Sequence, residues 1–534
     1  MLLATIVLLC VILFSFGNAF LHQVGPQEDE VQFVSAILPP LVGQMFVPFG
    51  GELYPVMIAT YAGALKALAY IGIFSIWPPD AVSLRVPMVL AGVATLILFF
   101  VFFRMVMGNL GALIATALLA FDPVFVTYTT LDSGIVTVQH LLMAAALPLF
   151  VQYHRTGRRA LLAAASFLCG LALWDKATFI WLIIGWGLGL AAIYWRELRP
   201  HRNVRPFSLA IACVLLGASP VIYYTLTEHK TAKTGMGGFG APTGNKAVVL
   251  LKTLDGSSPF SFFVRDPDMA TMRQPHTKVE RASAWLARAA GYPSRHLLFW
   301  ASVASVVLIP FLRPGPERRI MLFSLIAFFT GWLVMLPFAM GGAGSHHVIL
   351  LWPLPQMLVA SAVCALGTLA GRLRTAVALG LAAPVVLTCA LVTNQVYTHL
   401  TIFGPTDHWS DAIYPLFDWL RLKRPTSVYS LDWGIEGPLR LLSQGSFPLK
   451  DAPAMLSSQI PPERRRETIR DLLVRPRRMF IYYTDRSQHS GEHLNRLRAL
   501  AAEAGLLEEP LTKVNDRNNH PVYSVVRYVD APRQ

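Results

Sequence analysis

The stretch Met1–Glu30 reads MLLATIVLLCVILFSFGNAFLHQVGPQEDE, a mostly apolar run over residues 2–20 that leads into the carboxylates of Glu28, Asp29 and Glu30. A helix of about 20 apolar residues crosses the roughly 30 Å hydrocarbon core of a bilayer. The run lacks a basic start and a small-x-small cleavage site, so we expect an uncleaved first span and not a removed signal peptide. The stretch predicts a membrane span that delivers an acidic triplet to one face of the membrane.

The composition of the whole chain also indicates a membrane protein. Of 534 residues, 54% are apolar and 14% are charged, whereas soluble domains carry about 25% charged residues. The net charge of +14 lies largely in short loops between apolar segments, which is typical of cytoplasmic loops and anionic headgroups and not of a nucleic-acid-binding protein. All five cysteines lie inside apolar segments, so the sequence predicts no disulfide framework and no cysteine zinc site.

Apolar segments of spanning length recur over the first three quarters of the chain. We expect eleven spans, over residues 2–20, 84–103, 110–129, 134–153, 159–174, 177–195, 207–227, 297–312, 319–338, 347–369 and 373–393. A further apolar stretch, Val56–Trp77, is long enough to span but contains Lys66 and runs into two prolines. Its assignment depends on the charge of the loops.

Four short basic loops, at residues 154–159, 196–205, 313–319 and 371–374, are expected in the cytoplasm. With eleven spans and an internal N-terminus, all four lie inside and the acidic triplet lies outside. If Val56–Trp77 also spanned, the basic loops would stay inside only with an external N-terminus, and the triplet would become cytoplasmic. We therefore expect a juxtamembrane or re-entrant helix there, in a multi-pass protein of the inner (plasma) membrane.

Two outer loops, residues 21–83 and 228–295, and a hydrophilic tail then share the outer compartment. The tail, residues 394–534, alternates β-branched and aromatic runs at 427–431, 479–483 and 522–526 with helical patterns at 436–443 and 492–504. This alternation is typical of a small α/β domain. The sequence thus predicts a membrane domain over residues 1–393 and a soluble extracytoplasmic α/β domain after it.

Ionisable residues gather at the outer ends of the predicted spans, and such residues at membrane depth are functional candidates. They are Asp29, Glu30, Asp132, Asp175, Lys176, His346 and His347. Any one of them can also simply reach headgroups and water. A pair such as Asp29-Glu30 suits a general base with a partner, and Lys176 with the histidines suits a phosphate. The histidine doublet equally fits a metal ion.

Several short motifs occur in an order that resembles a known superfamily. They are Asp29-Glu30 after the first span, Tyr61-Ala-Gly-Ala-Leu-Lys66, Leu84-Arg-Val-Pro87, Ala120-Phe-Asp-Pro123 with Asp132 further on, Gly170-Leu-Ala-Leu-Trp-Asp-Lys176, and His346-His-Val-Ile-Leu-Leu-Trp-Pro353. Residues 1–393 thereby resemble the GT-C fold glycosyltransferases that depend on polyprenyl-phosphate sugars, in particular relatives of the protein O-mannosyltransferases and the aminoarabinose transferase of lipid A.

The resemblance implies an outer-face cavity for a polyprenyl-phosphate sugar, with Asp29 as the catalytic carboxylate and Glu30 as its partner. It places Asp132 near the donor sugar. We assign the donor contacts to Lys66, Lys176, His346 and His347. The chain departs from the family in having Glu52-Leu-Tyr-Pro55 for a Lys-Pro-Pro run, and His346-His347 for an Arg-Tyr pair.

The function that we predict is transfer of a hexosyl or pentosyl group from a polyprenyl-phosphate donor to an acceptor on the outer face. The acceptor stays open between protein, lipid and glycan. The scheme demands no metal, and a divalent ion is left open. Two rivals are a secondary transporter, which would show an internal repeat and helices broken at mid-membrane, and a membrane sensor or anchor whose periplasmic tail binds a ligand.

Overall fold

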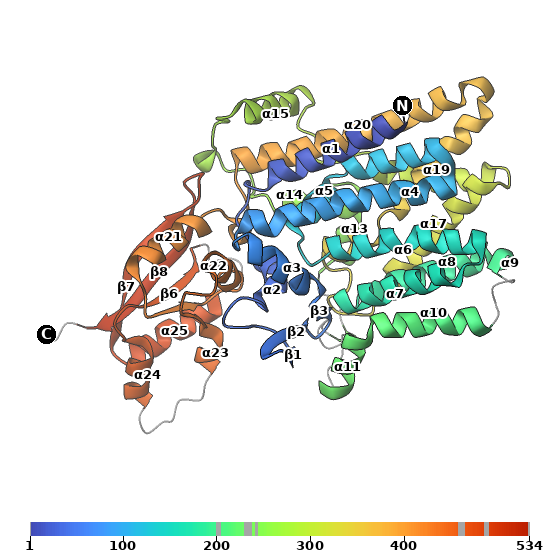
Figure 1. Ribbon diagram of the computed structural model, residues 1–534. Helices are drawn as coiled ribbons and strands as arrows, with labels where there is room; N and C mark the ends of the chain where they lie inside the picture. Colours follow the sequence, from blue (N-terminus) through green and yellow to red (C-terminus); the bar gives the residue numbers. More distant parts are fainter. Residues whose placement is uncertain are drawn as a thin grey trace.

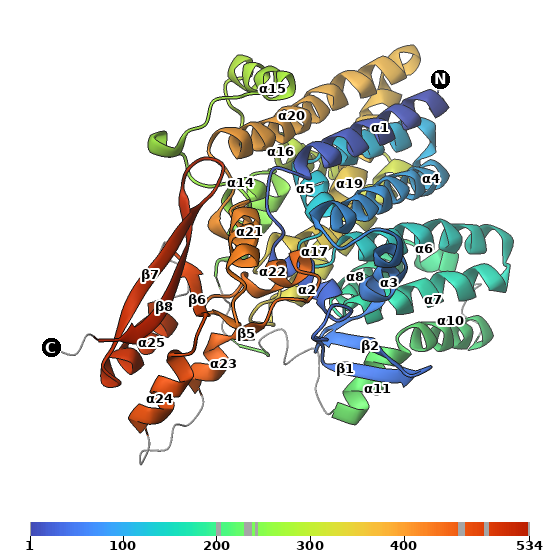
Figure 2. The ribbon, with the colours of Figure 1, turned by 60° about the vertical axis from the view of Figure 1, so that its left-hand side comes forward.

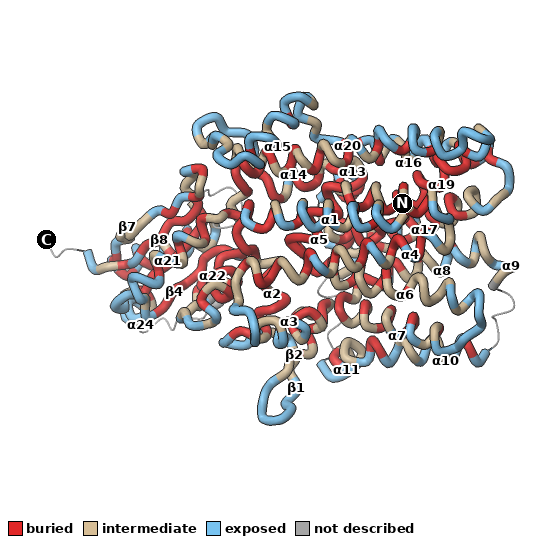
Figure 3. The backbone as a smooth tube through the Cα atoms, turned by 45° about the horizontal axis from the view of Figure 1, so that its top comes forward, coloured by how far each residue is buried: buried red, intermediate tan, exposed pale blue. Residues whose placement is uncertain are grey.

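The computed structural model describes residues 2–198, 204–228, 238–240, 244–457, 465–484 and 491–531. A bundle of long helices forms one end of the molecule and a sheet formed by the C-terminal residues forms the other (Figure 1). The loop after α1 (Leu2–Phe20), which is predicted from the sequence to be the first outer loop, lies between them. Buried residues continue from the bundle through this loop into the sheet (Figure 3), so the three parts share one packed interior.

The predicted spans are helical over most of their length. The bundle contains α1 (Leu2–Phe20), α4 (Ala81–Phe121), α5 (Pro123–Leu131), α6 (Thr137–Thr156), α7 (Arg159–Asp175), α8 (Phe179–Ile193), α10 (Val204–Gly217), α11 (Ser219–Glu228), α16 (Leu298–Leu308), α17 (Pro316–Met335), α18 (Ser345–Val348), α19 (Leu354–Leu369) and α20 (Arg374–Ile402). Among the described residues, four helices are long and apolar enough to cross a membrane, or up to six if each bent pair is one span. The number eleven therefore stays a prediction.

The long helix α4 explains part of this difference. Its 41 residues correspond to about 60 Å at about 1.5 Å per residue, roughly twice the thickness of the hydrocarbon core. Gly108 interrupts the helix with φ +72°. A Cβ atom on Gly92 would lie 2.2 Å from Cγ2 of Thr129, so the chain has doubled back after Gly108. The break falls between the predicted spans 84–103 and 110–129.

The first outer loop holds α2 (Glu28–Ser35), β1 (Met45–Phe49), β2 (Glu52–Ala59), β3 (Ala62–Gly63) and α3 (Leu65–Ile76). The prediction of a helix over Val56–Trp77 is wrong for its first part, because β2 pairs antiparallel with β1 there. The β-branched residues of that segment suit a strand. The remaining helix, α3, has 12 residues and is about 18 Å long, too short to span.

The second outer loop contributes short helices beside α20. They are α13 (Lys246–Leu254), α14 (Ser258–Phe262) and α15 (Lys278–Ala289). A hydrogen bond of 2.8 Å from Ser283 Oγ to Asn394 Oδ1 joins α15 to α20. Of the three, α15 lies along α20 at the edge of the bundle (Figure 1).

The C-terminal residues form a five-stranded sheet with helices. Its elements are α21 (Ile413–Lys423), β4 (Ser427–Ser430), α22 (Glu436–Leu442), β5 (Leu449–Asp451), α23 (Ala452–Ser457), α24 (Arg465–Leu473), β6 (Arg478–Tyr483), α25 (Gly491–Glu503), β7 (Leu506–Asn515) and β8 (Pro521–Asp530). The strand order is β5-β4-β6-β8-β7, and β4 is parallel to both β5 and β6. The three predicted strands lie at β4, β6 and β8, and the boundary expected after residue 393 falls inside α20.

Successive residues of β4 and β6 point to opposite faces of the sheet, as strand geometry requires. Val428 and Ile481 pack with α21 and α22, whereas Tyr429 and Phe480 pack with α23, α24 and α25. Helices therefore cover both faces (Figure 2).

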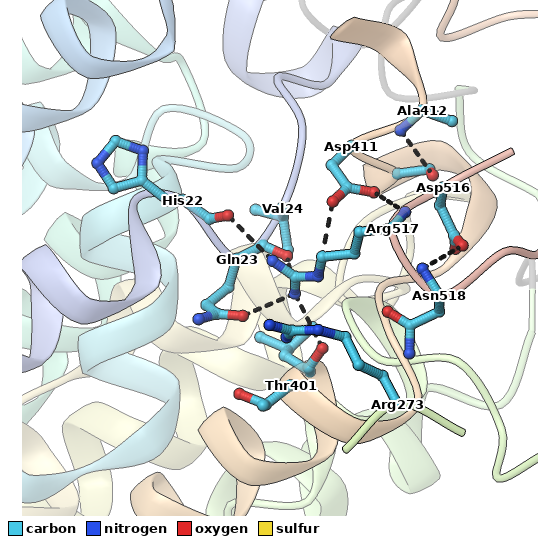
Figure 4. Close-up of polar contacts among 12 residues, drawn as sticks. His22, Gln23, Val24, Arg273, Thr401, Asp411, Ala412, Asp516, Arg517 and Asn518 are labelled. Carbon is cyan, nitrogen blue, oxygen red and sulfur yellow. Dashed lines mark hydrogen bonds and ion pairs between the residues drawn. The ribbon is translucent and has the colours of Figure 1, made fainter. Parts of the chain in front are cut away.

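Arg517, in the turn between β7 and β8, joins the sheet to the bundle (Figure 4). Its guanidinium donates hydrogen bonds to the Gln23 carbonyl (2.9 Å), to Gln23 Oε1 (2.6 Å) and to the Leu400 carbonyl (3.0 Å). Asp411 pairs with the same side chain at 3.5 Å. One arginine thus connects the segment after α1, the end of α20 and the tail.

We expect Arg517→Ala to lower the melting temperature of the purified protein in detergent. The change leaves several partly buried acceptors unsatisfied, at a cost of about 1–3 kcal/mol. Arg496→Ala, at an exposed position of α25, is the matched control and should leave the melting temperature unchanged. Equal melting temperatures for both variants would show that Arg517 does not stabilise the docked tail.

Candidate active site

The acidic triplet Glu28-Asp29-Glu30 occupies the first turn of α2, where its three side chains point in three directions. Consecutive helical residues are rotated by about 100°. Glu28 Oε2 accepts a hydrogen bond of 2.9 Å from the Gly437 amide of α22, and Glu30 points toward α4. Gln27 caps the helix by accepting from the Asp29 amide at 2.6 Å. The orientation of α2 therefore decides what each carboxylate meets.

Glu30 is fully engaged by Arg85, which lies in the first turns of α4. Nε of Arg85 donates to Glu30 Oε1 at 2.6 Å and Nη2 donates to Oε2 at 2.8 Å. The guanidinium also donates to the carbonyls of Leu21 (2.6 Å), Val24 (2.9 Å) and Gly25 (2.7 Å). Such bidentate pairs fix geometry as well as charge. The sequence offered Arg85 only as part of a motif, although an arginine inside an apolar span is itself a signal.

Lys66 and Asp132, both predicted to face the donor, form a buried ion pair with each other. Nζ of Lys66 lies 2.7 Å from Asp132 Oδ2, and each side chain is 1% exposed. Asp132 Oδ1 accepts from the amides of Val136 (3.1 Å) and Thr137 (2.9 Å). Asp132 therefore also caps the start of α6, where four helical amides need acceptors.

Asp29, Lys176 and His346 meet at Gly134. Nζ of Lys176 donates to the Gly134 carbonyl at 2.5 Å, and the Gly134 amide donates to the Asp29 carbonyl at 3.3 Å. Gly134 has φ +77°, and a Cβ atom there would lie 2.8 Å from the imidazole Cδ2 of His346. Only glycine fits this backbone conformation and this contact. The turn after α5 thus brings together three of the residues singled out from the sequence.

Contacts with β3, Tyr61 and Gln139 hold Lys176 beside the Gly134 turn. Its segment forms a β-bridge with Ala62 of β3, and its ammonium lies 5.9 Å from the ring centroid of Tyr61. Gln139 Nε2 donates to the Lys176 carbonyl at 2.9 Å. The side chain is 2% exposed, so its charge is held in a site with little water.

Asp29 has a different set of partners from Glu30 and Asp132. It is partly exposed, and Oδ1 accepts one hydrogen bond of 3.3 Å from Gln32. Within the residues that the structure describes, Asp29 forms no ion pair of the kind that holds Glu30 and Asp132. Burial raises the pKa of Asp29, and the charge of Lys176 opposes this rise. Burial lowers the pKa of Lys176 to about 8, against the attraction of Asp29, Asp175 and Asp132.

The two histidines have different surroundings. The His346 ring packs over Gly134, whereas His347 is buried against Trp181 with ring centroids 5.7 Å apart. Their own centroids are 4.2 Å apart. Over the described ranges, no group of three or more His, Cys, Asp or Glu side chains is arranged to hold a metal ion.

Asp175 lies at the end of a predicted span, and no role at the site was assigned to it from the sequence. It is fully buried, and neither carboxylate oxygen accepts a hydrogen bond from the described part of the chain. It directly precedes Lys176 and ends α7. In the sequence, Asp175 was detectable as a carboxylate next to a lysine at the end of an apolar segment.

We compared the chain and its structure with known proteins. Residues 66–224 match the family model of dolichyl-phosphate-mannose-protein mannosyltransferases. The structure is similar to crystal structures of ArnT from Cupriavidus metallidurans, bound to undecaprenyl phosphate or in the apo state. Both give a TM-score of 0.57 and 12% identity over 98% of this chain and 97% of that chain. The oligosaccharyltransferase of Archaeoglobus fulgidus in the apo form gives 0.49 and 14% identity over 96% and 69%. A search of curated protein sequences found no match.

The helical bundle with its C-terminal sheet has the GT-C fold of the ArnT structures, and residues 66–224 match a glycosyltransferase family model. The predicted resemblance to glycosyltransferases that use polyprenyl-phosphate-linked donors is confirmed at the level of this superfamily, with the family match carried by residues 66–224.

Gly134→Ala should lower the melting temperature more than Gly157→Ala does. Both glycines have positive φ, +77° and +67°, but a Cβ atom at Gly157 meets nothing within 4 Å whereas one at Gly134 meets His346. The left-handed conformation costs about 1–2 kcal/mol in either variant, and overpacking adds about 1–3 kcal/mol at Gly134. Equal losses in thermal unfolding would show that the imidazole moves aside freely.

Proposed function

We propose that the chain is a membrane glycosyltransferase that moves a sugar from a polyprenyl-phosphate-linked donor to a hydroxyl of an acceptor at the outer face of the membrane. The observation that carries this proposal is a partly exposed carboxylate, Asp29, held beside a buried ammonium, Lys176, through the Gly134 turn. ArnT, which shares the fold, has been crystallised with undecaprenyl phosphate. That carrier supports the same donor class for this chain.

The chemistry needs one base and one fixed positive charge. Asp29 takes the proton of the acceptor hydroxyl as the acceptor oxygen forms a bond to the anomeric carbon. The bond between that carbon and the phosphate oxygen breaks, and the polyprenyl phosphate leaves with the electron pair. Lys176 neutralises the departing phosphate in a site with little water, where a fixed charge is effective. His346 lines the same turn and is assigned to the donor.

The remaining candidates position this pair. Glu30, through Arg85, sets the orientation of α2 and thereby of Asp29. Lys66 and Asp132 hold the start of α6 and the turn that carries Gly134, and we keep their assignment beside the donor sugar. His347 supports His346 from the side of Trp181. A divalent metal is not needed for this scheme.

The proposal includes a topology. Eleven spans with the N-terminus inside place Asp29 and the C-terminal α/β domain outside, in the inner (plasma) membrane. The polar residues gather at one end of the helices, where a lipid-borne donor meets an acceptor. A transporter would bring them together at mid-membrane.

Asp29→Asn should reduce transfer by about 10² to 10⁴ fold, because removal of a positioned general base typically costs that much. Glu30→Gln should instead lower the melting temperature, since it leaves Arg85 without its ion pair. Glu52→Gln, at an exposed position, is the control for both.

Transfer is measured with membranes containing each variant and a panel of radiolabelled polyprenyl-phosphate sugars. Near wild-type turnover by Asp29→Asn would move the base to another residue, with Asp132 next in line.

The rate should show a bell-shaped dependence on pH. It rises as Asp29 loses its proton and falls near pH 8 as Lys176 loses its charge, because the pKa of Lys176 is lowered to about 8. Lys176→Met removes the charge that lowers the pKa of Asp29, so the rising limb should move to higher pH and the falling limb should disappear. A rising limb unchanged in Lys176→Met would show that the two groups are not coupled.

A further inference from the structure

The C-terminal sheet has a switch point between two neighbouring parallel strands. After β4 the chain enters α22, which packs on one face, and the next helix after β6 is α25, which packs on the other. In open sheets of this kind, ligands bind in the crevice outside the carboxyl ends of the strands at such a point. The proposed transfer reaction leaves this crevice unused.

A cavity of about 460 Å³ lies at this position, within the range of about 300–1,000 Å³ that holds small ligands. One wall is the loop after β4 with Asp432 and Trp433, and α22 adds Arg440. His493 of α25 closes the sheet side, and the opposite wall is α2 of the first outer loop, with Glu28 and Gln32. The cavity therefore forms between the loop that holds α2 and the C-terminal sheet, and both parts are needed to make it.

The polar walls favour a ligand with several hydrogen-bond donors. Carboxylates line the cavity, and an ionised carboxylate only accepts. Arg440, the cation that lines the cavity, already pairs with Glu436 and donates to the Pro40 carbonyl at 2.6 Å. An anionic ligand would meet net negative charge. Burial raises the pKa of Glu28 to about 7, so near neutral pH this group both accepts and donates, as a hydroxyl partner requires.

An aromatic side chain, Trp433, also lines the cavity. Trp433 is 50% exposed, and its ring lies 5.9 Å from that of His408 between centroids. Its ring offers a flat apolar surface against which the C–H face of a sugar ring packs, while the hydroxyls reach the carboxylates. A peptide that binds by strand addition runs along a sheet edge, whereas this cavity lies at strand ends.

The geometry points to a carbohydrate as the ligand of this cavity, and to this carbohydrate as the acceptor whose hydroxyl reaches Asp29. Glu28 lines the cavity and Asp29 does not, because the helical rotation turns Asp29 away from Glu28, so an acceptor bound in the cavity must extend around α2 for its hydroxyl to reach Asp29. The acceptor role rests on the proposed transfer activity, whereas carbohydrate binding by the cavity does not.

Binding is tested first, with the full-length protein in detergent and saturation-transfer NMR against glucose, mannose, galactose, N-acetylglucosamine and lactose. Trp433→Ala should lower the affinity for the sugar about tenfold, as loss of an aromatic contact does. Glu28→Gln should also lower this affinity. Trp285→Ala, 69% exposed on α15, and Glu492→Gln, exposed beside His493, should leave binding unchanged. Melting temperatures confirm that each variant is folded.

Transfer to the same sugars is measured next, at saturating donor. Trp433→Ala should raise the KM for the acceptor and leave the KM for the donor unchanged. Sugar binding that depends on Trp433, without transfer to these sugars, would retain the cavity assignment and remove the acceptor role, whereas absence of transfer to every acceptor in the membrane assay would remove the proposed function. Transfer with no sugar bound at the cavity, or transfer to a hydroxyl peptide with a KM that Trp433→Ala does not change, would overturn the carbohydrate assignment.

Discussion

Between α2 and α4, the carboxylate of Glu30 and the guanidinium of Arg85 meet with almost no exposed surface, and two hydrogen bonds of 2.6 and 2.8 Å join them. Burying two ions costs several kcal/mol each, which is recovered only with good geometry and further hydrogen bonds. Arg85 supplies these through three carbonyls of the segment after α1. The pair is compatible with only one orientation of α2 on the bundle, and the outer end of the molecule is built on that orientation.

With α2 fixed, the other two carboxylates of the triplet have their directions set by the helical rotation alone. Asp29 lies beside the Gly134 turn, whose amide donates to its carbonyl, and within the electrostatic reach of Lys176. Glu28 faces α22 and the C-terminal sheet. Three adjacent acids of the same chemical type thus acquire different environments: one is neutralised by an arginine, one lies near an ammonium, and one lies in a cavity wall. In the proposed mechanism, only the one near the ammonium takes the proton.

Hydropathy was sufficient to place the helices, because apolar runs of spanning length have few alternatives, and loop charge placed the candidate acids at one end. Hydropathy and loop charge did not predict which residues those acids pair with. Lys66 and Asp132 are 66 residues apart, and Glu28 and Gly437 are 409 apart, so only the folded chain shows that they meet. The left-handed residues around Gly134 have no periodic signature. The strand β2 was mistaken for helix because a short apolar run fits either structure until its pairing partner is known.

The proposed transfer reaction needs few catalytic groups, so the C-terminal tail contributes to the site in another way. A lipid phosphate is already a good leaving group, so a base and a fixed charge at the bundle end suffice for the chemistry proposed. In the proposed function, selection among hydroxyl-bearing acceptors then falls to other surfaces, and the cavity that α2 forms with the C-terminal sheet is the surface proposed here. Arg517 holds the two surfaces together by bonds to Gln23 and Leu400. A tail that undocked would leave Asp29 and Lys176 in place but remove the wall that presents the acceptor, so docking and acceptor use are coupled in this architecture.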